Sequence, residues 1–98
     1  VRVSPSVKDY ILRIVDATRR NDYIKLGVSP RGSISLHKVS KALAYINGRD
    51  FVTPDDIREM AVSVLAHRIM LTPKGKSVFN TQQAVIMDLV KRIPVPMQ

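Results

Sequence analysis

Three serine–proline or threonine–proline pairs mark candidate helix starts, at Ser4-Pro5, Ser29-Pro30 and Thr53-Pro54. A serine or threonine side chain can accept a hydrogen bond from the first turn of a helix. Proline suits the first helical position because its missing N–H would be unpaired there anyway. Apolar residues recur at three- and four-residue steps after each pair, as they do along one face of a helix. The pairs therefore predict amphipathic helices over about 5–20, 30–47 and 54–68.

A fourth helix is predicted from Thr81 to the prolines at 94 and 96. The apolar stripes of the four helices are Val7, Tyr10, Ile11, Ile14 and Val15; Leu36, Val39, Leu43 and Ile46; Ile57, Met60, Ala61, Val64 and Leu65; and Val85, Ile86, Leu89, Val90 and Ile93. Phe51 and Val52 are also expected to pack inward. The segment 69–80 is expected to be irregular, because Pro73 and Gly75 break helices. These patterns predict an all-α fold: one small four-helix domain over residues 1–98, with short irregular links and no substantial sheet.

The bulk composition narrows the functional classes. The chain has 98 residues, enough for one domain, and no cysteine, which excludes disulfides and thiolate metal sites. No apolar run approaches the roughly 18 residues of a membrane span. A first residue other than Met suggests a fragment of a longer protein, and the absence of cysteine fits a cytoplasmic location. Sixteen basic residues against eight acidic ones give a net charge of +8, which favours a polyanionic partner.

The start of the second predicted helix breaks two local rules. Arg31 places a cation in the positive first turn, at a cost of about 0.3–1 kcal/mol, and Gly32 weakens the helix by roughly 0.5–1 kcal/mol relative to alanine. A bound anion would resolve the conflict, because free N–H groups, the helix dipole and a guanidinium together form a phosphate site. Ser29, Pro30, Arg31, Gly32 and Lys38 are therefore candidate anion-binding residues. The alternative is that Arg31 points into water and Gly32 serves a tight turn.

Several ordered motifs resemble the C-terminal helical lid domain of MoxR-type AAA+ ATPases. They are Ile14-Val-Asp-Ala-Thr-Arg19, Leu26-Gly-Val-Ser-Pro-Arg-Gly32 with Lys38 and Lys41-Ala-Leu43, Asn47-Gly-Arg-Asp-Phe-Val-Thr-Pro-Asp-Asp-Ile57, Val64-Leu-Ala-His-Arg68 and Ile93-Pro-Val-Pro96. They cover nearly the whole chain. His37 departs from the pattern, since an apolar residue is expected there, and the segment 72–80 is not distinctive. These departures leave the subfamily open.

The resemblance implies a lid that closes over ATP bound to a separate α/β core domain. By motif position, Arg31 would contact the γ-phosphate as the second sensor, and it is the one catalytic candidate. The family implies a homo-oligomeric ring, commonly a hexamer, with chaperone-like activity and partners that carry a von Willebrand factor A domain. This chain lacks a Gly-x-x-x-x-Gly-Lys-Ser/Thr loop and paired acids after an apolar run, so Mg-ATP would be held mainly by the core. The chain alone should not hydrolyse ATP.

Other functions are weighed against this interpretation. A small basic helical module that binds nucleic acid is the main alternative, but the third helix starts with Asp55 and Asp56, where base-reading residues should lie. Capping explains these two carboxylates. His37 and His67 are thirty residues apart and no cysteine accompanies them, so no metal site is predicted. A role for Arg68 at a ring interface, or a pure protein-interaction module, remains an alternative.

Overall fold

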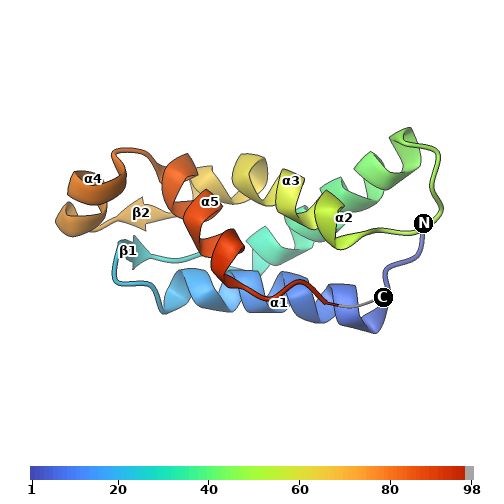
Figure 1. Cartoon of the computed structure of the whole chain (residues 1–98), viewed down its shortest axis with the longest axis horizontal. Coiled ribbons are helices and arrows are strands. Elements are labelled where there is room, and N and C mark those ends of the chain that lie inside the picture. The colour runs from blue at the N-terminus through green and yellow to red at the C-terminus, as the bar shows by residue number, and fades with distance from the viewer. Residues whose placement is uncertain (97–98) are drawn as a thin grey trace.

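The computed structural model describes residues 1–96 and contains five α-helices and one short antiparallel sheet (Figure 1). In chain order the elements are α1 (Pro5–Arg19), β1 (Ile24–Leu26), α2 (Pro30–Ile46), α3 (Pro54–Leu65), the 3-10 helix η1 (Ala66–Arg68), β2 (Met70–Leu71), α4 (Pro73–Phe79) and α5 (Gln82–Arg92). The all-α prediction is confirmed, since the sheet pairs only five residues. All four predicted helices form.

The segment between Ile69 and Asn80 is more regular than the sequence predicted. Thr72 accepts a hydrogen bond from the Gly75 N–H at 3.0 Å, and Pro73 takes the first position of α4. This is a fourth use of the cap and proline pattern, so Pro73 begins a helix instead of breaking one. Gly75 is buried against the Tyr23 carbonyl oxygen, where a Cβ would overlap it. The prediction of an irregular segment was therefore wrong, because both apparent breakers serve α4.

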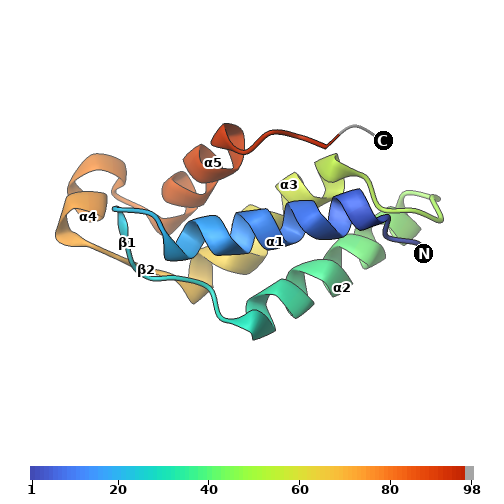
Figure 2. The same ribbon diagram turned by 90° about the horizontal axis from the view of Figure 1, so that it is seen from below.

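The core lies around α3, which packs against α1, α2 and α5 in an elongated molecule of 42 × 22 × 20 Å (Figures 1 and 2). The predicted stripe of α1 is entirely buried. Ile57, Ala61 and Leu65 of α3 meet it, and Val85, Ile86, Leu89 and Val90 of α5 close the other side. Three of the four sequence stripes thus supply the core, while their partly buried residues lie at its margin.

The stripe predicted for α2 was wrong at Val39 and Ile46, whereas Leu36 is buried as predicted. The residues that α2 buries are Gly32, Leu36, Ser40 and Ala44, one at each four-residue step. Val39 and Ile46 lie on the exposed surface instead, Ile46 with 76% of its area exposed. Small side chains let α2 approach its neighbours closely, so the contact line follows residue size as well as hydropathy. Phe51 was also expected inside and is exposed, whereas Val52 is buried as expected.

Candidate functional site at the start of α2

The first turn of α2 lacks the side-chain cap that the other α-helices have. Ser4, Thr53, Thr72 and Thr81 each accept a hydrogen bond from a backbone N–H of the helix that follows. Ser29 holds the same position before α2, but its hydroxyl makes no such bond. There is also no acidic residue in this turn. No side chain caps this turn, and the Gly32 N–H donates instead to the Ser29 carbonyl at 2.9 Å.

The segment that leads into α2 is fixed to the end of α1. The Val28 N–H donates to the buried Thr18 hydroxyl at 3.0 Å, and that hydroxyl donates to the Val15 carbonyl at 2.6 Å. The Arg19 Nε donates to the Val28 carbonyl at 2.8 Å. Gly27 lies so close to α1 that a Cβ would come within 2.8 Å of the Thr18 carbonyl oxygen. Both polar groups of Val28 are thus held, and Ser29 to Arg31 extend from a fixed point.

Arg31 lies exposed in the first turn of α2, without a hydrogen bond or ion pair to any of residues 1–96. Lys38 is also exposed. It lies two turns further along α2, on the same side of the helix as Arg31, as the sequence predicted. Ser29 and Pro30 are exposed next to Arg31. Four of the five candidate residues are thus exposed, and their joint role in anion binding stays a prediction.

Gly32, the fifth candidate, is buried and does not lie on that face. A Cβ at this position would overlap the Val28 side chain and lie 3.3 Å from the Arg68 Cδ. The close approach that Gly32 permits here is therefore made by the protein itself. Contact between Gly32 and a ligand stays a prediction.

Arg68 is a further cation beside this helix start. Its side chain crosses the first turn of α2, and its Nη2 donates to the Ser35 hydroxyl at 3.1 Å. The sequence indicated only a possible role for Arg68 at a ring interface. Its position at the end of η1 does not reveal which helix its side chain contacts. The structure adds a second guanidinium to the cationic surroundings of Arg31.

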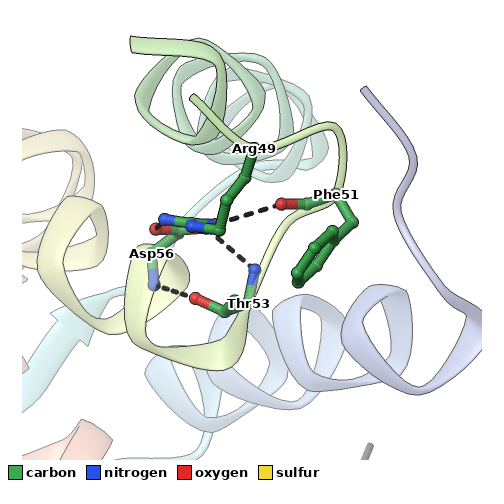
Figure 3. A network of polar contacts seen from close by, with 4 residues as sticks. All are labelled: Arg49, Phe51, Thr53 and Asp56. Atoms are coloured by element: carbon green, nitrogen blue, oxygen red, sulfur yellow. Dashed lines mark hydrogen bonds and ion pairs between the residues drawn. The ribbon is translucent and has the colours of Figure 1, made fainter. Parts of the chain in front are cut away.

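A separate polar network at the start of α3 accounts for the motif from Arg49 to Asp56 (Figure 3). The two Nη atoms of Arg49 donate to the two carboxylate oxygens of Asp56, each at 2.7 Å. Asp56 also accepts from the Thr53 N–H at 2.8 Å, and the Thr53 hydroxyl accepts from the Asp56 N–H. This reciprocal cap confirms the capping interpretation of Asp56.

The network shifts the pKa values of its members. Burial raises the pKa of Asp56, but hydrogen bonds from Arg49 and the Thr53 backbone outweigh burial and leave the pKa below its ordinary value. The same carboxylate raises the pKa of Arg49. Asp50, by contrast, lies 3.7 Å from Arg2, with both side chains exposed. The network holds the link before α3 in place, and we assign it no catalytic role.

No group of three or more histidine or carboxylate side chains within residues 1–96 is arranged to hold a metal ion. None of the helices in this part of the chain is long and apolar enough to cross a membrane.

Comparison with known proteins gives consistent matches. A family model described as the AAA lid domain matches residues 16–92. YeaC of Bacillus subtilis is 43% identical over the whole chain, and the chaperone MoxR1 of Mycobacterium tuberculosis is 32% identical over 96% of it. A crystal structure of a Cytophaga hutchinsonii protein described as an ATPase superposes on 99% of the chain with a TM-score of 0.88 and 32% identity. The chain spans about a third of each of these three proteins, at 31%, 27% and 32% of their lengths.

Proposed function

The chain belongs to the AAA lid domain family and is a lid of the MoxR-type AAA+ ATPases, and from this we propose that it closes over ATP and senses the γ-phosphate through Arg31. The observation that carries the proposal is the start of α2. There a guanidinium without a partner in residues 1–96 stands beside N–H groups that no side chain caps. Guanidinium, N–H groups and helix dipole all favour an anion at this point.

The other candidate residues have supporting roles in this proposal. Ser29 and Pro30 set the position of Arg31, since they follow directly after the anchored Val28. Lys38 extends the positive potential along the exposed face of α2. Gly32 keeps the first turn close to Val28 and Arg68. Mg²⁺ and most of the ATP would be held by a core domain outside these 98 residues.

The setting of the lid is part of the same proposal. We expect residues 1–98 to form one lid domain of a longer cytoplasmic ATPase that hydrolyses ATP. Its partners would be the core domain of its own polypeptide and the neighbouring subunits of a homo-oligomeric ring, commonly a hexamer. A chaperone-like role is supported by the similarity to the chaperone MoxR1. Proteins with a von Willebrand factor A domain are proposed as partners on the family resemblance alone.

The test is Arg31→Ala in the full-length protein, with ATP turnover as the readout. Arg31 is exposed and has no partner in the described part of the chain, so we expect an unchanged fold. We expect turnover to fall by about a hundredfold or more, as when a donor to developing negative charge is removed. Lys91→Ala, which removes an exposed cation from α5, serves as the control and should leave turnover unchanged. Normal turnover in Arg31→Ala would exclude the sensor role.

A further inference from the structure

An apolar groove of about 300 Å³ lies between α1 and α2, two helices that pack side by side (Figure 2). Ile11 is buried and forms its floor. Leu12 of α1 and Ile34 of α2 line it while exposing 59% and 57% of their areas. Two large apolar side chains thus stand at the surface beside a hollow that an apolar side chain of a partner could fill.

Two lysines and a histidine line this groove. Lys8 of α1 and His37 and Lys38 of α2 line it, and no carboxylate of residues 1–96 does. Burial lowers the pKa of His37, and the charges of Lys41 and Lys8 lower it further.

The carboxylates of the chain are already used elsewhere. Six of the eight acidic residues form the ion pairs found in residues 1–96, and an arginine is the partner in each. None of those pairs involves a lysine, so Lys8 and Lys38 keep their charge available. Only Asp22 and Glu59 of these eight acids stand outside the pairs. A second copy of this chain therefore offers a poor match to the groove.

We propose that the groove between α1 and α2 binds an acidic amphipathic helix of a separate partner protein. An apolar side chain of that helix enters between Leu12 and Ile34, and its carboxylates on the adjoining turns meet Lys8 and Lys38. Insertion of one apolar helix face into a groove is a common mode of peptide recognition. The lysines give the complex its charge selectivity and its association rate, while the apolar contact gives most of the affinity. This surface shares Lys38 with the proposed ATP-binding face, but it does not depend on the role of Arg31.

The experiment uses the full-length protein and a fluorescein-labelled helical peptide with leucines on one face and glutamates beside them. Fluorescence polarisation should show saturable binding of this peptide. A matched peptide with lysine at each glutamate position should bind at least about tenfold more weakly. The double substitution Leu12→Ser and Ile34→Ser should lower the affinity for the glutamate peptide at least about tenfold, because the apolar contact is lost. Both residues are exposed, so the fold should be retained.

Two substitutions outside the groove serve as controls. Ile46→Ser removes an exposed apolar residue from the same helix, and Lys91→Glu reverses an exposed cation on α5. Both should leave the affinity for the glutamate peptide within about twofold of the wild-type value, whereas Lys38→Glu should lower that affinity several-fold. The proposal is overturned if the glutamate peptide does not bind, if the lysine peptide binds equally well, or if the controls weaken binding as much as the groove variants.

A labelling experiment distinguishes a partner protein from other occupants. The chain has no cysteine, so Ile34→Cys and Ile46→Cys introduce single sites for maleimide within it. Equal labelling rates in the full-length protein would show that the groove is open to a partner. Protection of the thiol introduced in place of Ile34 at every protein concentration would mean that the protein's own polypeptide fills the groove. Protection that rises with concentration would mean that a second copy fills it. Either form of protection overturns the proposal.

Discussion

Gly32 and Gly75 each let another part of the chain lie directly against a helix. At Gly32 the Val28 and Arg68 side chains cover the first turn of α2, and at Gly75 the Tyr23 carbonyl meets the first turn of α4. Around Gly75, the rings of Tyr23 and Phe79 pack edge to face at 5.0 Å, and Lys74 lies 5.3 Å from the Tyr23 ring centre. In both cases the absence of a side chain serves packing, which helix propensity does not describe.

Gly32→Ala should therefore destabilise the domain, although glycine to alanine in an exposed helix usually stabilises by up to about 1 kcal/mol. The added methyl group overlaps Val28, and overpacking of this kind costs about 1–3 kcal/mol. Urea denaturation would measure the difference. Val28→Ala in the Gly32→Ala background should recover part of the loss, because it removes the overlapping atoms. A Gly32→Ala variant as stable as the wild type would mean that Val28 moves aside without cost.

Ser40 is expected to respond in the opposite direction. Its hydroxyl is fully buried in α2 and, like that of Tyr10, has no hydrogen-bond partner among the described residues. Removal of a buried unsatisfied hydroxyl, together with the higher helix propensity of alanine, should make Ser40→Ala about 1 kcal/mol more stable. That gain corresponds to roughly 4–8 °C in melting temperature for a domain of this size. Ser35→Ala is the comparison, because its hydroxyl accepts from Arg68 and its loss should bring no gain.

The sequence predicted the contacts of some residues better than those of others. The role of Asp56 could be predicted because its cap partner Thr53 lies three positions away. The sequence also placed Arg31 and Lys38 on one side of α2. The contact of Arg68 with Ser35 joins residues 33 positions apart, and no local pattern encodes it. Sequence therefore predicted the exposed members of the candidate site better than the packing beneath them.

At the scale of elements, start signals predicted the helices more reliably than apolar stripes predicted their buried faces. The cap and proline pattern predicted the helix start wherever it was applied, although Ser29 makes no cap bond at α2. Its occurrence at Thr72-Pro73 would also have predicted α4. The stripe of α2 failed at Val39 and Ile46 because the buried line of this helix consists of Leu36 and three small residues. The two strands are too short for a period-two alternation of apolar and polar residues to predict them. Tertiary contacts decide such features.

The start of α3 gives an acid-dependent prediction for Asp56→Asn. The folded-state pKa of Asp56 is depressed, so this carboxylate stabilises the fold above its ordinary pKa of 3.8 and loses that effect as pH falls toward the folded value. The variant should be less stable than the wild type at neutral pH. The difference in unfolding free energy should shrink as pH falls below 3.8. Denaturation at a series of pH values measures it.

Asp55→Asn provides the control for this pH series. Asp55 is exposed and lies 3.6 Å from Arg58, so its replacement should change stability little at any pH. A stability difference for Asp56→Asn that stays constant from neutral to acidic pH would contradict a role for its charge. The cap would then act through its geometry alone.

At the scale of the whole molecule, different parts of the surface of α2 have different contacts. One side is packed into the core, the first turn presents Arg31, and the side toward α1 carries the apolar groove. The chain spans about a third of the length of its relatives. The proposed phosphate site and the proposed docking groove would each be completed by another molecule or domain.

The incompleteness of the phosphate site makes a quantitative prediction for the 98-residue chain alone. One charge-assisted hydrogen bond contributes about 1.5–3 kcal/mol net, whereas a dissociation constant of about 1 mM requires about 4 kcal/mol. Arg31 and the first turn of α2 should therefore bind ATP with millimolar affinity or weaker in isothermal titration calorimetry. Whatever binding remains should weaken further in Arg31→Ala and with added salt, because it is electrostatic. A low-micromolar affinity would show instead that the chain holds the nucleotide through contacts other than a single sensor arginine.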